Sequence, residues 1–208
     1  RLFALLLASA SFFLSSGVQA QARELAPDAL VKSVTDEVLD IIRKDKDIKA
    51  GSTRRAIELV EQKVLPHFNF SRMTALAVGR DWRQATPEQQ KALTEEFRDL
   101  LVRTYSNALT AYKNETVDYR PFKMQPGETD VTVRTQIHQA GARQPITLDY
   151  SLEKNGNAWK VYDVVVAGVS LVTNYRSSFA TEIRNGGIDG LIKTLKAKNA
   201  SLEANVKK

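Results

Sequence analysis

Apolar residues recur every three to four positions through most of the first half of the chain. This spacing is typical of amphipathic helices that bury one face. It predicts helices over residues 27–44, 52–65 and 71–78, with Ser52 capping the second helix and Pro66 ending it. The stripe of the first helix consists of Leu30, Val31, Val34, Val38, Leu39, Ile41 and Ile42.

The longest helical pattern begins at a capping box. Thr86, Pro87 and Gln89 stand at the N-cap, first and third helical positions, where these residue types are preferred. An apolar stripe then continues for about 25 residues, which at 1.5 Å per residue is a rod of roughly 37 Å. We expect this helix to be the backbone of the domain. Its stripe contains Leu93, Phe97, Leu100, Leu101, Tyr105, Leu109 and Tyr112.

The period of the pattern then changes from 3.6 to 2, which is typical of strands. Strands are predicted over residues 117–121, 131–138, 146–152 and 159–166. Gly141 lies in one turn, and Asn155-Gly156 is a strong signal for a hairpin turn. Four consecutive strands with such turns predict an antiparallel meander with one apolar face and one wet face.

Helical spacing returns over residues 170–184 and 188–198, with a break at Gly186-Gly187. Helices, then strands, then helices predict an α+β fold with a curved four-stranded antiparallel sheet and helices packed on one side of it. A sheet curved around helices encloses either a packed core or a cavity. Periodicity does not distinguish the two.

Residues 1–20 have the pattern of a cleavable export signal. Arg1 is basic, residues 2–14 are almost all apolar, and small residues lead up to Ala20, so cleavage is predicted before Gln21. The apolar run is shorter than the about 20 residues that span a bilayer. A buried N-terminal helix is the alternative. We therefore expect a single domain over residues 21–200, soluble and outside the cytoplasm, with a frayed tail over residues 201–208.

The composition limits which binding partners and which kinds of reactive or metal site are expected. The formal net charge is +6, so the surface favours anionic partners such as lipid headgroups or acidic proteins, and export argues against nucleic acid. The chain has no cysteine, which leaves apolar burial to hold the fold together and removes thiolate chemistry. His67 and His138 are the only histidines, and their spacing favours no metal site.

Catalytic candidates are few. Asp163, beside Tyr162 in the last strand, could act as a general base if it faced an apolar cavity, and a solvated or ion-paired carboxylate is the favoured alternative. Ser170 is interpreted as the cap of the following helix, because no nucleophile-elbow motif surrounds it. We therefore expect no catalytic residues and no enzymatic activity. An isomerase- or hydratase-like enzyme that uses an acidic residue in the pocket remains the competing hypothesis.

Several segments resemble one family in the same order along nearly the whole predicted mature chain. The chain is similar to the MlaC family, also called the toluene-tolerance auxiliary proteins. The segments that carry the resemblance are residues 66–70 (PHFNF), 78–89 (VGRDWRQATPEQ), 97–101 (FRDLL), 104–105 (TY), 159–164 (WKVYDV), 168–172 (GVSLV) and 174–176 (NYR).

The resemblance implies a periplasmic phospholipid-binding protein with a nuclear-transport-factor-like cone around an apolar pocket. Members of the family shuttle glycerophospholipid between an outer-membrane lipoprotein–porin complex and an inner-membrane ABC transporter with an MCE-domain protein, which maintains the lipid asymmetry of the outer membrane. The implied cargo is a phospholipid, and no cofactor is implied. A carrier that meets two membranes is expected to be monomeric.

The predicted inward faces suggest which residues would line the pocket, with ordinary core packing as the alternative for each of them. Arg80, Arg83 and Arg176 are conceivable phosphate contacts, and solvated or ion-paired arginine is the favoured interpretation. The lipid-binding candidates are Leu93, Phe97, Leu101, Tyr105 and Leu109 from the long helix, Val131, Val133, Ile146, Leu148, Tyr150, Val164 and Val166 from the sheet, and Val169, Leu171, Val172, Tyr175 and Phe179 at the mouth.

Overall fold

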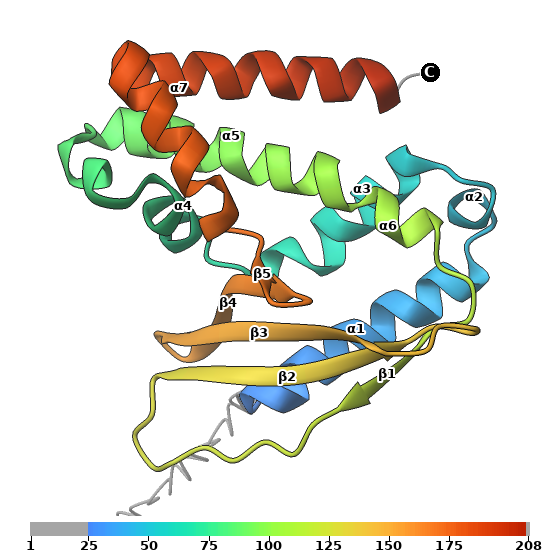
Figure 1. Ribbon diagram of the computed structural model, residues 1–208. Coiled ribbons are helices and arrows are strands. Elements are labelled where there is room, and N and C mark those ends of the chain that lie inside the picture. The colour runs from blue at the N-terminus through green and yellow to red at the C-terminus, as the bar shows by residue number, and fades with distance from the viewer. Residues whose placement is uncertain (1–24, 207–208) are drawn as a thin grey trace, which may run out of the picture.

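The computed structural model describes residues 25–206 and has the predicted α+β fold. The predicted export signal lies outside the described residues. Figure 1 shows the sheet below, one helix behind it and a helical layer above the edge formed by its last strands. Within residues 25–206, no helix combines the length and apolar character that a membrane crossing needs.

The first three helices are α1 (Pro27–Lys44), α2 (Lys46–Lys49) and α3 (Thr53–Lys63). The predicted cap of α3 is confirmed, because Ser52 Oγ accepts a hydrogen bond from the amide of Arg55. The polar stretch after α1 contains the short helix α2, which the periodicity did not predict. Its only apolar residue, Ile48, is fully buried, and one such residue is too few to produce a visible period.

Asp45 is the cap of α2 and also ties this helix to α3. Its carboxylate accepts hydrogen bonds from the amides of Asp47 and Ile48, both at 3.0 Å, and from Nε of Arg55 at 2.8 Å. The hydrogen bond from the Ile48 amide, followed by that from Arg55, lowers the pKa of the Asp45 carboxyl. The charged form is therefore the one that stabilises this corner of the fold.

A carboxyl with a lowered pKa stabilises the fold above its unfolded-state pKa of about 3.9, and the effect is lost as the pH falls through the folded-state pKa. We therefore expect Asp45→Asn to be less stable than the unchanged protein near neutral pH. The difference should shrink as the pH falls below about 4. Urea unfolding of both proteins across this range checks the prediction, and a difference that does not depend on pH would contradict it.

The next elements are η1 (Leu65–His67), α4 (Phe70–Val78), η2 (Gly79–Gln84), α5 (Pro87–Tyr105) and α6 (Asn107–Thr110). The capping box at the start of α5 is confirmed, with reciprocal hydrogen bonds between Thr86 and Gln89. The predicted rod to Tyr112 is wrong, because α5 ends at Tyr105. Serine and asparagine, which favour helix ends, follow at Ser106 and Asn107. Tyr112 instead accepts a hydrogen bond from Arg43 Nε at 3.0 Å.

The sheet is antiparallel with the strand order β1-β2-β3-β4-β5. Its strands are β1 (Thr116–Tyr119), β2 (Asp130–His138), β3 (Ile146–Asn155), β4 (Ala158–Val166) and β5 (Val169–Ser170). The four predicted strands are confirmed, and β5 is an additional one. It forms because Ala167 and Gly168, with φ of 49° and 85°, turn the chain back along β4.

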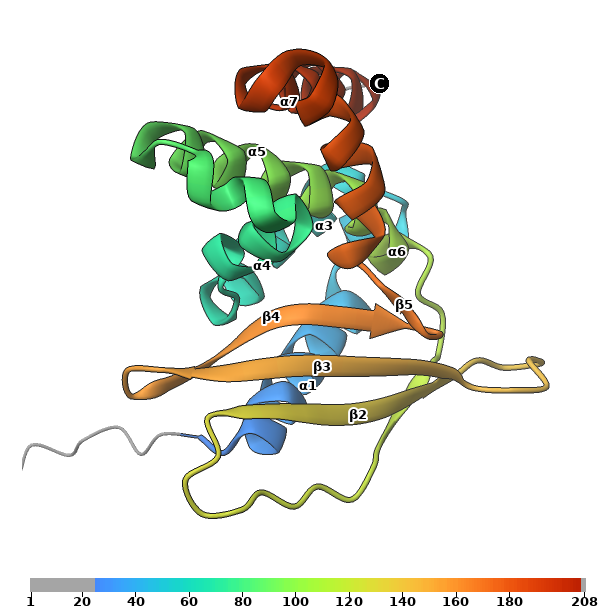
Figure 2. The same ribbon diagram turned by 60° about the vertical axis from the view of Figure 1, so that its left-hand side comes forward.

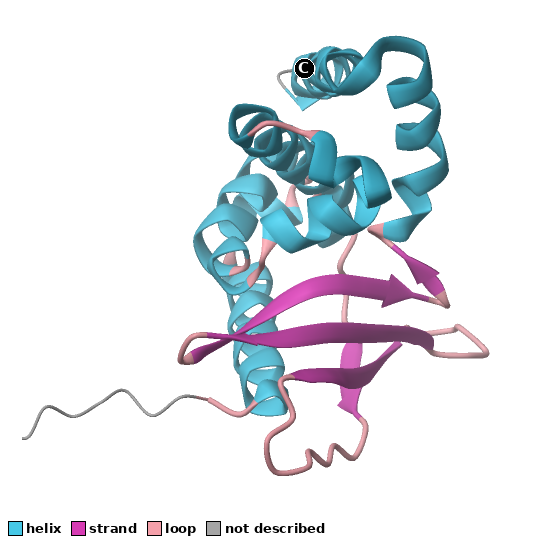
Figure 3. Cartoon of the chain, turned by 90° about the vertical axis from the view of Figure 1, so that its left-hand side faces the viewer, coloured by secondary structure: helices cyan, strands magenta, loops and turns pink. Residues whose placement is uncertain are grey.

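One face of the sheet packs on α1, and the other carries none of the described helices (Figures 1 and 2). Leu30 and Val31 of α1 pack with Val133, Trp159 and Val161 of the sheet in one buried cluster. The other helices lie beyond the β4 edge, as Figure 3 shows from the side. The structure is thus a sheet with a helix on one face and a separate helical layer at one edge.

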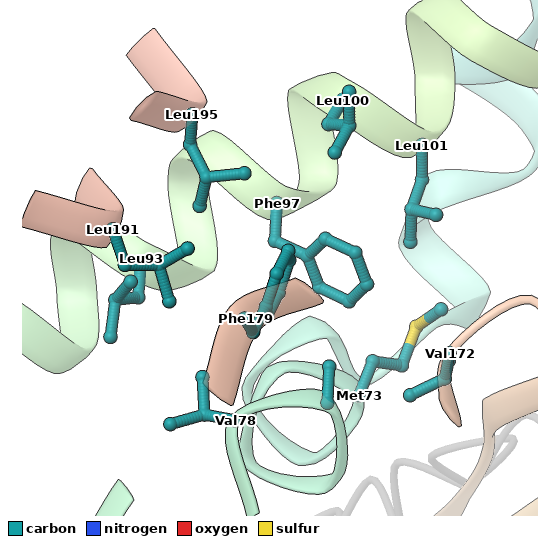
Figure 4. Close-up of a cluster of buried hydrophobic side chains, with 11 residues drawn as sticks. Met73, Val78, Leu93, Phe97, Leu100, Leu101, Val172, Phe179, Leu191 and Leu195 are labelled. Atoms are coloured by element: carbon teal, nitrogen blue, oxygen red, sulfur yellow. The ribbon is translucent and has the colours of Figure 1, made fainter. Parts of the chain in front are cut away.

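The helical layer has its own core, formed by α4, α5 and α7 (Arg176–Val206). Figure 4 shows Phe97 of α5 at its centre, facing Phe179 of α7. The rings of Phe97 and Phe179 meet edge to face at 5.2 Å, and Phe97 meets Tyr175 in the same way. The η3 turn (Thr173–Tyr175) leads from β5 into α7.

The predicted break within the last helical segment is confirmed. Gly187 has a φ of 68°, and α7 changes direction there. The fraying that we expected over residues 201–208 is not seen over residues 201–206, which are helical. Leu202 packs against the helical core, and Glu203 faces Arg103 of α5 at 3.8 Å. These contacts explain why the helix continues, and residues 207–208 lie outside the described residues.

Arg72 of α4 joins the helical layer to the sheet. Its guanidinium stacks on the ring of Tyr162 at 3.5 Å and forms ion pairs with Asp130 and Glu153. Tyr162 Oη donates a hydrogen bond to the same Asp130 at 2.5 Å. Helix α4 is therefore fixed to β2, β3 and β4 through one side chain.

Replacing Arg72 by methionine is expected to lower the free energy of unfolding by about 1–3 kcal/mol, because Glu153 is only 17% exposed and loses its cation. Arg54→Met is the matched control. Arg54 is 80% exposed in its ion pair with Glu58, so its loss should cost less than about 1 kcal/mol. Urea unfolding measures both effects, and equal losses in the two variants would refute the prediction.

Candidate ligand-binding cavity

An apolar cavity of about 220 Å³ lies where the helical layer meets α1 and the end of the sheet. Its walls come from α1, α3, α4, α5, α6, β4 and the segment after β5. Only two of its residues, Tyr105 and Ser106, carry a hydroxyl group. The cavity is lined by Val38, Val60, Val64, Leu65, Phe68, Phe70, Met73, Leu101, Val102, Tyr105, Ser106, Leu109, Val164 and Leu171. We call it the upper cavity.

A second apolar cavity, of about 210 Å³, lies between α1 and the sheet. We call it the lower cavity. Its polar side chains are those of Thr35, His67 and Tyr150. It is lined by Leu30, Val31, Val34, Thr35, Val38, Leu39, Val64, His67, Phe68, Leu109, Val117, Ile137, Leu148, Tyr150 and Val161.

The two cavities are neighbours, because Val38, Val64, Phe68 and Leu109 line both of them. These four residues come from α1, the end of α3, the segment before α4, and α6. Together the cavities offer space of the size that small-molecule sites have, about 300–1,000 Å³. The shared residues form a wall that side-chain movement could open.

The segment around Pro66 is held against the sheet and positions this wall. Phe68 pairs with Val161 in an isolated parallel bridge, and the amide of Asn69 donates to the carbonyl of Val161 at 2.8 Å. The ammonium group of Lys160 donates to the carbonyl of Pro66. These bonds satisfy the backbone of a segment that turns between two helices, and they leave Phe68 at the cavity wall.

The titratable groups of the lower cavity are shifted toward their neutral forms. Burial, followed by the positive charge of Lys160, lowers the pKa of His67. Burial also raises the pKa of the Tyr150 hydroxyl. Both groups are therefore uncharged near neutral pH, and the cavity walls carry no charge that would oppose an apolar ligand.

Seven of the seventeen lipid-binding candidates line these cavities. Five of them belong to the upper cavity, namely Leu101, Tyr105, Leu109, Val164 and Leu171. Leu148 and Tyr150 belong to the lower cavity, and Leu109 lines both. The structure thus brings together residues from the long helical stripe, the sheet and the segment after β5.

The other ten candidates lie elsewhere. The helical core contains Leu93, Phe97, Val172 and Phe179, with Tyr175 packed against it. The cluster between α1 and the sheet contains Val133, with Val131 and Val166 packed against it. Ile146 is partly buried opposite Ile137, and Val169 is 52% exposed. For all seventeen residues, contact with a lipid stays a prediction.

Sequence reasoning missed the contribution of the first helices to the cavities. Val34 and Val38 of α1 were assigned to a helical stripe but not to a site, and Val60 and Val64 at the end of α3 lie in the second predicted helix without having been considered for a site. The spacing of these residues predicts that they point inward, but it does not show what they contact. Phe68 and Phe70 lie outside any periodic segment, and only the resemblance to the family marked that stretch.

Asp163 lies in β4 and is 9% exposed. Its carboxylate accepts hydrogen bonds from its neighbour's amide, Val164 N, at 2.8 Å and from Ser170 Oγ at 2.7 Å. Ser170 Oγ in turn accepts hydrogen bonds from the amides of Val172 and Thr173. The prediction that Ser170 caps the following helix is wrong, because Ser170 belongs to β5 and the N-cap of η3 is Val172, which makes no side-chain cap hydrogen bond. Asp163 is not among the residues that line either cavity, and its contacts hold the turn into η3.

The three arginines considered as phosphate contacts, for which a solvated or ion-paired state was favoured, are also outside the cavity walls. Arg176 donates two hydrogen bonds to the carbonyl of Leu76, at 2.8 and 3.1 Å, and so ties α7 to α4. Arg80 and Arg83 are exposed on η2. Among residues 25–206, no group of three or more histidine, aspartate or glutamate side chains is arranged to hold a metal ion.

The fold and these cavities define an α+β protein with an open antiparallel sheet and room for an apolar ligand between the sheet and its helices. The model of the MlaC protein family matches residues 32–197. The chain therefore belongs to the MlaC family.

Individual relatives agree with this membership. The chain is 26% identical over 171 residues to the intermembrane phospholipid transport system binding protein MlaC of Haemophilus influenzae, covering 81% of this chain and 80% of that protein. It is 28% identical over 164 residues to the toluene tolerance protein ttg2D of Pseudomonas putida, covering 78% and 75% of the two chains.

A solved structure has the same fold. It is the phospholipid-binding protein of Ralstonia solanacearum in complex with a phospholipid, which is 42% identical to this chain with a TM-score of 0.79. The similarity covers 86% of this chain and 99% of the other. This related structure contains a bound phospholipid. A phospholipid is an amphiphile, and its acyl tails require an apolar enclosure.

Proposed function

We propose that this protein is a periplasmic phospholipid carrier that holds the acyl tails of a glycerophospholipid in the upper and lower cavities. The observation that carries the proposal is the pair of adjacent apolar cavities, with uncharged walls, on either side of Val38, Val64, Phe68 and Leu109. The phospholipid complex of the 42% identical relative supports the choice of ligand. The headgroup would remain near solvent.

The energetics explain why such a ligand needs a carrier. Two 16-carbon tails contain about 30 methylenes, and exposing them to water would cost on the order of 25 kcal/mol at about 0.8 kcal/mol each. Free diffusion between membranes is therefore negligible. The tails move between a bilayer and a cavity that is equally apolar, so the net free-energy change is small and both loading and release are allowed.

We further propose that the protein moves this lipid between an outer-membrane lipoprotein–porin complex and an inner-membrane ABC transporter with an MCE-domain protein, and so maintains outer-membrane lipid asymmetry. The intermembrane transport role named for the Haemophilus influenzae relative supports this. The protein is expected to act as a monomer and without catalysis. The hydrogen bonds of Asp163 in the turn to η3, and its position outside both cavity walls, support the carrier over the competing enzyme hypothesis.

Transfer between vesicles tests the carrier function. Donor vesicles with labelled phospholipid and unlabelled acceptor vesicles, each carrying one of the two membrane complexes, are mixed with or without the purified protein. We expect transfer to the acceptor only when the protein is present, at a rate proportional to its concentration. Equal transfer with and without the protein would reject the proposal.

A further inference from the structure

The wall of the upper cavity contains a buried hydroxyl group without a partner. Ser106 is 3% exposed, and its Oγ has no hydrogen-bond partner among residues 25–206. Most buried polar groups in folded proteins are paired, so an exception requires an explanation. The position of Ser106 in a cavity that is otherwise almost entirely hydrocarbon suggests that the partner is the ligand.

The backbone amide and carbonyl of Ser106 both have hydrogen-bond partners within the protein. The amide of Ser106 donates to the carbonyl of Val102 at 2.9 Å, and its carbonyl accepts from the amide of Leu109 at 3.0 Å. Ser106 is both the C-cap of α5 and the N-cap of the short helix α6. Of the polar groups of Ser106, only the hydroxyl is unpaired within residues 25–206. Rotation about its Cα–Cβ bond can turn this hydroxyl toward a ligand.

The surroundings of Ser106 indicate which part of a ligand it would meet. Its neighbours on the cavity wall include Val102 and Leu109, which offer no hydrogen bond, and Tyr105, which is 36% exposed. Ser106 itself is 3% exposed, so the wall passes from solvent to the interior between Tyr105 and Ser106, which are consecutive in the chain. In a diacyl phospholipid, the groups between the solvated headgroup and the buried tails are the ester linkages.

We infer that the Ser106 hydroxyl donates a hydrogen bond to an ester carbonyl oxygen of the bound lipid, which makes it a specificity-determining residue for ester-linked lipids. The inference rests on the proposed function. An ether-linked lipid with the same headgroup and chain length lacks this acceptor, so it would fill the cavities but leave Ser106 unpaired. The site therefore distinguishes lipids by their linkage as well as by their apolar volume.

Binding of two matched lipids tests the inference. The affinities of a diester phosphatidylethanolamine and of its diether analogue are measured for the unchanged protein, for Ser106→Ala and for Ser106→Thr. We expect the unchanged protein to prefer the diester about three- to tenfold, which is the effect of one hydrogen bond. Ser106→Ala should bind the two lipids equally, and Ser106→Thr should restore the preference because it keeps the hydroxyl.

The lipid-free stability separates this role from a structural one. Because the hydroxyl has no partner in the protein, Ser106→Ala without lipid should unfold at the same or a higher temperature than the unchanged protein. Ser178→Ala, which removes an exposed hydroxyl that donates to the carbonyl of Tyr175 at the end of η3, is the control and should leave the diester preference unchanged.

Three results would overturn the inference. The first is an unchanged protein that binds both lipids equally, as it would if a water molecule satisfied Ser106. The second is a diester preference that Ser106→Ala retains. The third is a lipid-free Ser106→Ala protein that is markedly less stable, which would show that the hydroxyl serves the fold. Failure of the unchanged protein to bind either lipid would instead reject the proposed function, and the inference with it.

Discussion

Val64→Trp is expected to reduce the phospholipid bound by the purified protein by at least about tenfold, with little loss of stability. Val64 lines both cavities, so an indole at this position takes up space on either side of the shared wall. Overpacking a filled core costs about 1–3 kcal/mol, and the cost falls where a cavity accepts the added atoms. The measurement is lipid per mole of protein after extraction, combined with thermal unfolding.

Ile57→Trp is the matched control for this substitution. Ile57 lies in α3, the helix that Val64 caps, and its replacement by tryptophan is a similar increase in size. Its side chain lines a surface groove with Glu58 and Arg103 instead of the cavities. We expect Ile57→Trp to retain its lipid. Full lipid content in Val64→Trp, or an equal loss in both variants, would contradict the assignment of the cavities as the lipid site.

Phe97→Ala is expected to destabilise the protein by about 3–5 kcal/mol, because Phe97 is fully buried and its removal leaves a cavity. It also removes the two edge-to-face contacts with Tyr175 and Phe179. For a domain of this size, such a loss lowers the unfolding temperature by roughly 6–20 °C. Thermal unfolding of the variant and the unchanged protein provides the measurement.

The same variant tests whether Phe97 touches the lipid. Phe97 lies in the helical core and not among the residues that line the two cavities, so the folded fraction of Phe97→Ala should retain phospholipid. Leu101→Ala serves as the comparison, because Leu101 belongs both to this core and to the upper cavity. If the Phe97→Ala protein is folded but contains no bound phospholipid, Phe97 contributes to lipid binding after all.

The elements that the sequence predicted correctly are those with local signals. The capping box at Thr86, the Ser52 cap and the turn after Asn155 depend on residues within a few positions of one another. Amphipathic periodicity also predicted α1 and the strands β1 to β4 correctly. Caps, turns and periodicity can be recognised in a single sequence because they do not depend on knowing the tertiary contacts.

The elements that were missed depend on contacts between distant segments. Helix α5 ends at Tyr105 although apolar residues continue at helical spacing, and Tyr112, beyond this end, contacts Arg43 of α1 instead of extending the stripe. Strand β5 exists because a turn folds Val169 back on Val166. Such pairings leave no periodic trace in either segment.

The candidate site was predicted only in part for the same reason. An inward-facing apolar residue can contact either another side chain or a cavity, and both arrangements have the same sequence pattern. Phe97 and Leu101 belong to one helical stripe, yet only Leu101 lines a cavity. The cavities arise where α1, the Phe68 segment and the sheet leave space between them, which is a property of the packing.

The central claim is that the cavities hold one phospholipid cargo, and native mass spectrometry tests it most directly. The protein is purified without detergent, and its mass is compared with that of the same sample after organic extraction. We predict a mass difference equal to a diacyl phospholipid on most molecules, and loss of this difference in Val64→Trp. Identical masses before and after extraction, with the fold intact, would contradict the account.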